Sequence, residues 1–156
     1  MDQNDLNYIR ASIEVARKAR EKGNHPFGAI LVDEQGEFLM EAENTVITDR
    51  DSTGHAETNL IRLATAKYDT DFLEKCTMYA STEPCPMCAA AIFWGNVGRV
   101  VYALSSSSFY KLLGDEYGDS LPITCREVFA KGNKNIEVIG PVHEEEAKEV
   151  HKDFWI

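Results

Sequence analysis

Two short segments, 30 positions apart, constrain this chain most strongly, because both carry side chains that can bind one metal ion. The first is "GHAE" at residues 54–57 and the second is "PCPMC" at residues 84–88. The proline between the two cysteines suits the first position of a helix, so Cys85 would cap this helix and Cys88 would lie on its first turn. His55 would open a second helix. If the three side chains meet, two helix starts must lie at one edge of the fold.

One histidine and two cysteines form a set of ligands that suits zinc. Three protein ligands leave the fourth tetrahedral position open to water, whereas structural zinc sites are closed by four, and no fourth ligand is spaced here to close the site. Zinc lowers the pKa of such a water to about 7. Glu57, two residues after His55, would then lie within reach of the water and could carry its proton. We therefore expect one Zn²⁺ per subunit, bound by His55, Cys85 and Cys88, with Glu57 as the catalytic group.

Other interpretations of these residues remain open. A lone C-x-x-C pattern is a weak signal and also occurs as a redox pair. A structural or regulatory zinc protein is the non-enzymatic alternative, and Glu57 alone would fit an acid that favours a helix start. A scaffold has no need of this carboxylate beside an open metal site, so Glu57 favours catalysis. Cys76 and Cys125 lie outside any metal-type spacing and are expected to be buried thiols.

Composition limits the classes of partner and location. The 156 residues suffice for one domain over 1–156, and 44% of them are hydrophobic. The net charge of −10 makes nucleic acid an unlikely partner, because an acidic surface repels phosphate backbones. No apolar run is long enough to span a bilayer, so no membrane partner is expected. The first ten residues, "MDQNDLNYIR", lack the apolar core of a secretory signal. We expect a cytoplasmic protein.

The pattern of apolar residues predicts alternating helices and strands. Helices are expected over 4–22, 55–67, 86–95, 123–131 and 144–156, strands over 27–33, 37–44, 75–82, 98–104 and 136–140, and loops over 46–54 and the serine run 105–108. The first two strands flank a glycine turn and should form an antiparallel hairpin, whereas strands that alternate with helices should be parallel. This order predicts a three-layer α/β/α fold with a mixed five-stranded sheet and helices on both faces.

The combination of H-x-E and P-C-x-x-C resembles the signature of zinc-dependent nucleobase deaminases. The chain is similar to the cytidine-deaminase-like superfamily, and within it to the guanine and nucleoside deaminase branch. The likeness covers most of residues 5–104 and includes "HPFGAILV" (25–32), "HAETNLIR" (55–62) and "STEPCPMCAAAIFWGNVGRVVYA" (81–103). The resemblance implies a five-stranded mixed sheet with helices on both faces, a small-molecule nucleobase or nucleoside as substrate, and a homodimer or larger assembly.

The resemblance also implies roles for individual residues. His55, Cys85 and Cys88 match the zinc ligands, and Glu57 matches the residue that moves protons. Four further positions are expected to contact the substrate: Asn44 by hydrogen bonding to the base, Phe27 as an aromatic wall, Ala56 through its backbone N–H, and Trp155 in a C-terminal tail that caps the site of its own or a partner subunit.

The implied reaction is the hydrolytic deamination of guanine to xanthine, or of guanosine, with release of ammonia. A cytosine or cytidine deaminase and a tRNA adenosine deaminase are alternatives, and the tRNA branch is disfavoured because it relies on basic residues. The resemblance implies an acidic residue in the loop after the fourth strand, as in guanine deaminases. Here this loop is Ser105–Ser108, and Asp115 or Asp119 could replace that residue.

Other aromatic and histidine side chains have simpler explanations. Core packing explains Phe27 and Trp94 at least as well as a functional role does. His25, His143 and His151 lack ligand-type spacing and are expected at the surface.

Overall fold

The computed structural model describes residues 1–155 and confirms the three-layer α/β/α fold. Its elements are α1 (Gln3–Glu21), β1 (Gly28–Val32), β2 (Phe38–Glu43), α2 (Ala56–Lys67), α3 (Thr70–Glu74), β3 (Thr77–Thr82), α4 (Pro86–Gly95), β4 (Arg99–Leu104), α5 (Ser106–Leu113), α6 (Cys125–Ala130), β5 (Glu137–Ile139) and α7 (Glu144–Glu149). The five strands form one sheet in the order β2-β1-β3-β4-β5. β1 is antiparallel to both of its neighbours, whereas β3, β4 and β5 are parallel.

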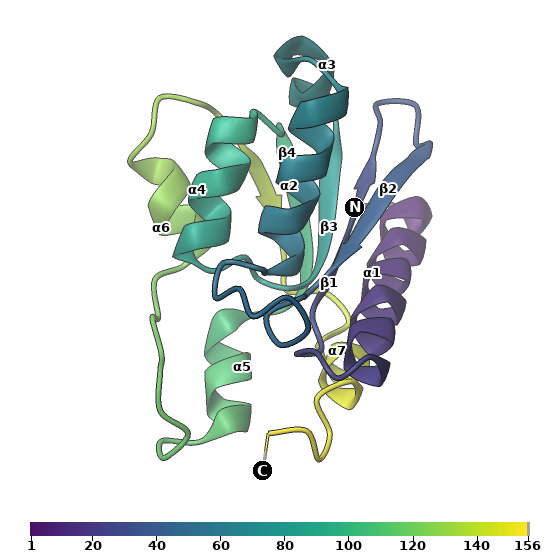
Figure 1. Ribbon diagram of the computed structural model, residues 1–156. Helices are drawn as coiled ribbons and strands as arrows, with labels where there is room; N and C mark the ends of the chain where they lie inside the picture. Colours follow the sequence, from purple (N-terminus) through teal and green to yellow (C-terminus); the bar gives the residue numbers. More distant parts are fainter. Residues whose placement is uncertain (156) are drawn as a thin grey trace.

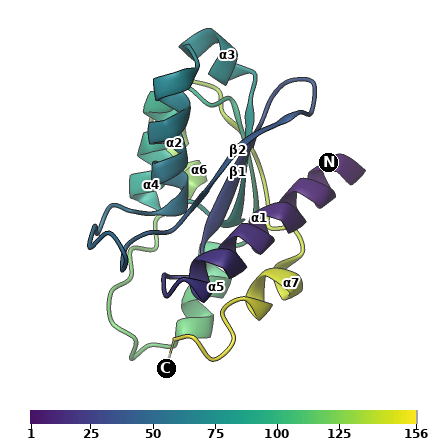
Figure 2. The same ribbon diagram turned by 45° about the vertical axis from the view of Figure 1, so that its right-hand side comes forward.

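Helices cover both faces of the sheet (Figure 1). In Figure 2 the sheet is seen close to edge-on, with α2, α4 and α6 on one side and α1 and α7 on the other. α5 lies below the sheet rather than against either face, close to the C-terminal end of the described chain (Figure 1). The edge beneath the sheet is therefore enclosed by α5 and by the C-terminal residues.

The central strands supply side chains to two separate cores. All residues of β1 and β3 are buried, because these strands lie inside the sheet and helices cover both faces. Neighbouring residues of a strand point to opposite faces. The core beneath α2, α4 and α6 contains Leu31, Met78 and Val100, and the core beneath α1 and α7 contains Ile30, Tyr79 and Val101. Complete burial of each aliphatic side chain contributes roughly 1.5–3 kcal/mol.

The helix α1 approaches the start of β1 very closely. A Cβ atom at Gly28 would lie 2.5 Å from the backbone nitrogen of Ala16, so this contact requires a residue without a side chain. The Gly28 N–H also donates to the hydroxyl of Ser81 on the neighbouring strand, at 3.0 Å. These contacts fix the backbone next to Phe27, the residue that enters the site described below.

Several chain segments meet at one edge of the sheet. β3 and β4 are parallel, so their carboxyl ends lie together, and β2 also ends at this edge while the antiparallel β1 begins there. Ligand sites of open α/β sheets form outside the carboxyl ends of the strands. The loops after β2, β3 and β4 therefore meet at the place where a site is expected.

The serine run after β4 was predicted to be a loop, and this prediction is wrong. Ser106 begins α5, and the hydroxyl of Ser105 accepts a hydrogen bond from the backbone N–H of Ser108 at 3.2 Å. Serine is a favoured helix cap for this reason, and the cap stabilises the helix start by about 1 kcal/mol. The helix expected at 123–131 is present as α6, and the short α3 was not predicted.

The last helix is shorter than predicted. α7 ends at Glu149, and the chain continues through turns to Phe154 rather than as a helix. Asp153 has a φ of 60°, a left-handed backbone conformation that cannot continue a right-handed helix. Ile156, which ends the predicted helix, lies outside the described residues.

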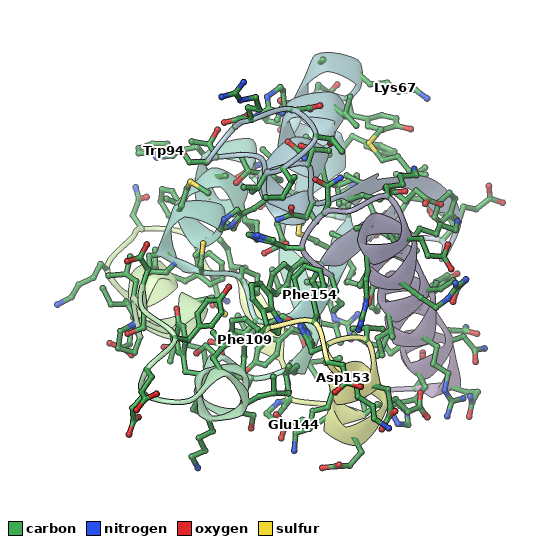
Figure 3. All side chains as sticks on the ribbon, turned by 60° about the horizontal axis from the view of Figure 1, so that its bottom comes forward. Lys67, Trp94, Phe109, Glu144, Asp153 and Phe154 are labelled. Carbon is green, nitrogen blue, oxygen red and sulfur yellow. The ribbon has the colours of Figure 1, made fainter. Side chains whose placement is uncertain are left out.

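Two side chains are placed opposite to their expected environments. Trp94 is 77% exposed, because α4 turns Ile92 and Gly95 towards the core and leaves Trp94 on its outer face. Figure 3 shows Trp94 at the periphery, pointing away from the molecule. His151 was expected at the surface but is only 2% exposed, because it packs against the rings of Phe27 and Phe109.

Candidate active site

The three predicted metal ligands meet at the starts of two helices. His55 occupies the N-cap of α2 and Cys85 the N-cap of α4, while Cys88 lies in the first turn of α4. Nδ1 of His55 is 3.5 Å from the Sγ atom of Cys85 and 3.5 Å from the Sγ atom of Cys88. All three ligand atoms lie within 4.8 Å of one another. Residues 30 positions apart in the sequence therefore form one cluster.

These separations fit a tetrahedral zinc ion. With Zn–S bonds of about 2.3 Å and Zn–N bonds of about 2.0–2.1 Å, tetrahedral angles place nitrogen and sulfur ligands about 3.5 Å apart. The observed His55–Cys85 and His55–Cys88 separations equal this value. Two thiols and an imidazole are also the ligand types that zinc prefers. The cluster therefore suits zinc in both geometry and chemistry.

Close packing of α2 against α4 aligns the two helix starts. A Cβ atom at Gly95 would come within 2.9 Å of Cγ2 of Ile61, so the glycine permits the helices to approach. Near the other end of α4, the hydroxyl of Thr58 lies 3.2 Å from the Sγ atom of Cys88. This contact ties a metal ligand on α4 to the first turn of α2, beside His55.

The cluster favours a thiolate. A hydrogen bond from Cys88, with a further one from His55, lowers the pKa of Cys85 to about 4. The pKa of Cys88 is raised, because its proton is shared with the Cys85 thiolate and because it is buried. The hydrogen bond to Cys85 raises the pKa of His55. Cys85 is thus the group that holds a negative charge ready for a cation.

Glu57 lies beside this cluster and faces a cavity. Its side chain is only 6% exposed, and burial is the main reason that its pKa rises to about 7; the Cys85 thiolate raises it further. A carboxyl group with a pKa near neutral pH can both accept and donate a proton, as general acid–base catalysis requires. The position of Glu57 in the first turn of α2 therefore suits proton transfer at the metal.

The cavity measures about 110 Å³ and has two chemically different parts. His55, Cys85 and Glu57 form the end at the metal cluster. The apolar and aromatic part of the lining consists of Phe27, Phe109, Tyr110, Leu121 and Ile123. Such a pocket accommodates a flat, partly apolar molecule with a polar group turned towards the metal end.

Three further polar side chains line this cavity. The hydroxyl oxygen of Thr82, at the end of β3, is buried and has no hydrogen-bond partner among residues 1–155. Ser106 lines the cavity from the first position of α5. Glu83 also lines it, but both of its carboxylate oxygens accept hydrogen bonds from backbone N–H groups. An unpartnered buried hydroxyl is costly, so Thr82 is suited to bind a polar atom within the cavity.

Only one of the four residues expected to contact the substrate lines the cavity. Phe27 lines the cavity, whereas Asn44, Ala56 and Trp155 do not belong to its lining. The side-chain oxygen of Asn44 accepts a hydrogen bond from the N–H of Val46 at 3.0 Å, as expected for a loop residue. Ala56 is the first residue of α2, where a backbone N–H has no partner within the helix. The roles of these residues in substrate binding stay predictions.

Trp155 lies behind the cavity wall, within an aromatic cluster. Its ring centroid is 6.0 Å from that of Phe27 and 5.7 Å from that of Phe109, and both of these rings line the cavity. The ring of Phe154, labelled with Phe109 in Figure 3, also lies beside Trp155, at a centroid separation of 4.8 Å. The C-terminal tail thus supports the wall that Phe27 and Phe109 form.

Several cavity residues were not predicted as site residues. Thr82, Glu83, Leu121 and Ile123 carry no metal-type or helix-start signal in the sequence, and their shared position arises only from folding. Asp115 and Asp119, the acidic candidates near the fourth strand, are exposed and do not line the cavity. Among the residues that line it, the segment after β4 contributes Ser106, the first residue of α5, instead of an acid.

The fold and the site together define a zinc-dependent hydrolytic deaminase. A family model described as the cytidine and deoxycytidylate deaminase zinc-binding region matches residues 2–104. The chain belongs to this family. The match includes His55, Glu57, Cys85 and Cys88 and ends where β4 ends.

Individual relatives differ in the base on which they act. A probable cytosine deaminase of Schizosaccharomyces pombe is 45% identical over 99% of this chain and 94% of its own length. A tRNA-specific adenosine deaminase of Bacillus subtilis is 37% identical over 94% of this chain and 84% of its own length. Among solved structures, a guanine deaminase of Nitrosomonas europaea superimposes with a TM-score of 0.78 at 25% identity, covering 95% of this chain and 82% of that chain. The comparisons therefore show the family of this chain, but the relatives in that family are named for different substrates.

Within residues 1–155, none of the helices combines the length and the apolar character needed to cross a membrane.

Proposed function

We propose that this enzyme deaminates a free nucleobase and that cytosine is its main substrate. The size of the cavity carries this proposal. The cavity beside the metal cluster measures about 110 Å³. An apolar protein cavity of about 150 Å³ is known to hold one benzene molecule, so the space here suits one six-membered ring. A ribose or a second fused ring would need additional room.

The lining of the cavity supports a flat ring with a polar edge. Phe27 and Phe109 provide aromatic surfaces for the ring, at a centroid separation of 5.4 Å from each other. The buried hydroxyl of Thr82 can bond a ring nitrogen or carbonyl oxygen. We infer that Asn44 and the N–H of Ala56 contribute further hydrogen bonds when a base is bound.

The reaction needs a nucleophile and a proton carrier. Zinc, when bound to His55, Cys85 and Cys88, supplies a water acidic enough to react near neutral pH. Glu57 accepts a proton from the attacking water at its buried carboxylate and delivers it to a ring nitrogen. It then accepts a second proton, from the hydroxyl group that has added to the base, and delivers this one to the departing amine. The products are ammonia and the keto form of the base.

Guanine is the second candidate substrate. The sequence resemblance favoured guanine or guanosine, and the structural likeness to the guanine deaminase of Nitrosomonas europaea supports that choice. A purine carries a second fused ring and needs more room than a one-ring base in this cavity of about 110 Å³. Guanine therefore stays a prediction that ranks behind the one-ring base.

The deciding experiment measures ammonia release by the zinc-loaded enzyme on matched pairs of bases and nucleosides. The panel contains cytosine and cytidine, guanine and guanosine, and adenine and adenosine, with a tRNA as a separate arm. We expect the highest kcat/KM with cytosine and at least a tenfold lower value with cytidine. A preference for guanine would replace cytosine by the second candidate, and activity on tRNA alone would overturn the free-base proposal. Glu57→Ala serves as the inactive control in every arm.

We also propose that the enzyme forms a homodimer and that residues 1–156 constitute one deaminase domain. α2 and α4 pack side by side, and each exposes a large apolar side chain: Leu63 is 53% exposed and Trp94 is 77% exposed. Sedimentation of the wild type and of Trp94→Glu tests the dimer, because a charge at this position would disrupt an apolar contact. Location in the cytoplasm stays a prediction from the sequence.

A further inference from the structure

Glu83 makes two hydrogen bonds that join distant parts of the chain. It follows β3 and precedes the Pro84-Cys85 pair, and its side chain is only 6% exposed. Oε1 accepts a hydrogen bond from the backbone N–H of Ser106 at 3.0 Å. Oε2 accepts one from the backbone N–H of Cys125 at 3.1 Å. A single carboxylate thus binds the first residue of α5 and the first residue of α6.

Ser106 and Cys125 are the two ends of a segment that leaves the sheet and returns to it. We call this segment the flap (residues 106–125). The flap leaves the sheet with α5 and returns at the start of α6. In Figure 1 it extends below the carboxyl ends of the strands. Within the flap, the backbone N–H of Leu121 donates to the phenolic oxygen of Tyr110 at 3.1 Å, which joins the returning segment to α5.

The flap forms the outer wall of the cavity. Five of the residues that line the cavity belong to it: Ser106, Phe109, Tyr110, Leu121 and Ile123. The metal end of the cavity, in contrast, is built on α2 and on the segment after β3. Glu83 is two residues from Cys85 and therefore lies at the junction between the metal ligands and the flap.

The hydrogen bonds of Glu83 are stronger than ordinary ones. Bonds from an N–H to an ionised carboxylate are roughly twice as strong as bonds between neutral groups. Burial removes competing water and makes an unpaired N–H costly. Each oxygen accepts a hydrogen bond from a backbone N–H group at a helix start, so the carboxylate is held between α5 and α6. This arrangement favours a role in positioning these segments.

We propose that Glu83 is a positioning residue whose carboxylate holds both ends of the flap against the carboxyl end of β3. In this way it sets the distance between the outer wall of the cavity and the metal ligands. The proposal rests on the proposed function only in that the cavity binds the substrate, and it holds for whichever base is deaminated.

Two substitutions remove either both acceptor oxygens of Glu83 or one of them. Glu83→Ala removes both acceptors and leaves the N–H groups of Ser106 and Cys125 unpaired. Glu83→Gln retains one acceptor oxygen and places an amide NH₂ group against the other N–H. We expect KM to rise about tenfold or more in the alanine variant, which corresponds to the loss of one strong hydrogen bond, and to rise by less in the glutamine variant. The zinc content should stay at one ion per chain.

Glu127→Gln provides a matched control. Glu127 accepts hydrogen bonds from the N–H and the hydroxyl of Thr124, so it also caps α6, but it is exposed and does not line the cavity. Its substitution should change neither KM nor the zinc content.

Amide hydrogen exchange of the zinc-loaded enzyme, measured without substrate, tests the proposal directly. Residues 106–125 should exchange faster in Glu83→Ala than in the wild type and in Glu127→Gln. Unchanged exchange in the flap would overturn the proposal, as would a loss of zinc and kcat at constant KM, which would make Glu83 a support of the metal ligands. If the alanine variant does not fold, the same comparison is made with Glu83→Gln. Because the exchange measurement uses no substrate, it is independent of the identity of the base.

Discussion

The indole N–H of Trp155 donates a hydrogen bond to Nδ1 of His151 at a distance of 3.0 Å. The two rings are stacked at an interplanar angle of 23°. His151 also contacts the rings of Phe27 and Phe109, at centroid separations of 5.4 and 5.2 Å. These two phenylalanines line the cavity at the metal cluster. The C-terminal tail is therefore joined to the wall of the active site through this buried histidine, in addition to the contacts of Trp155 with the same two rings.

His151 makes stability depend on pH. Because Nδ1 accepts the bond from Trp155, the ring is neutral and carries its proton on Nε2. Burial, assisted by the charge of Arg20, lowers the pKa of His151 to about 4. Unfolded histidine has a pKa of about 6.5, so below that pH the unfolded chain binds a proton that the folded chain does not. The free energy of unfolding should fall by about 1.4 kcal/mol per pH unit between these two values, or about 3 kcal/mol in total.

Denaturant unfolding between pH 7.5 and pH 4.5 measures this effect. The comparison is between the wild type and His151→Phe, because the other titrating groups are common to both and cancel in the difference. We expect a shallower decline in the variant as the pH falls. Parallel curves for the two proteins would show that His151 is protonated equally in the folded and unfolded states.

The tail should contribute to catalysis more than to stability. Removing residues 154–156 takes away the Trp155 ring, which packs behind Phe27 and Phe109. We expect kcat/KM to fall roughly 3–10-fold, the equivalent of an aromatic contact, with a smaller effect on the unfolding midpoint. Trp155→Phe retains an aromatic ring but removes the N–H donor, so it separates packing from the hydrogen bond. An unchanged turnover rate after the truncation would refute a role of the tail at the site.

Glu57→Ala should retain zinc and lose activity. Glu57 is not one of the three metal ligands, so one zinc ion per chain is expected to remain bound. Loss of general acid–base catalysis lowers kcat by about 10²–10⁴-fold. The test combines metal analysis of the purified variant with the ammonia assay. Full activity in a zinc-loaded variant would mean that another group transfers the protons.

Thr58 should tune the affinity for zinc. Its hydroxyl lies 3.2 Å from the Sγ atom of Cys88, and groups that contact metal ligands typically change metal affinity about 10–100-fold when they are removed. We expect Thr58→Val to weaken zinc binding to this extent in competition with a chelator. Thr65→Val is the matched control on the same helix, because the Thr65 hydroxyl donates only to backbone carbonyls of α2. Equal affinities of the two variants would contradict the role of Thr58.

The sequence by itself determined the features that depend on short spacings. The pairs His55–Glu57 and Cys85–Cys88 revealed the metal site, because residues at a helix start have predictable directions. Apolar runs and turn residues likewise identified the five strands and most of the helices. In both cases the signal lies within a few neighbouring residues, where backbone geometry relates sequence to direction.

The tertiary structure alone decided the wall of the cavity and its supports. Glu83 accepts hydrogen bonds from the N–H groups of Ser106 and Cys125, which lie 23 and 42 positions away in the sequence. No local sequence pattern predicts such distant partners. His151 became buried because the tail folds back against Phe27 and Phe109. Trp94 became exposed because α4 turns its other face to the core. Burial and long-range hydrogen bonds depend on which distant segments pack together, and the folded chain alone fixes that choice.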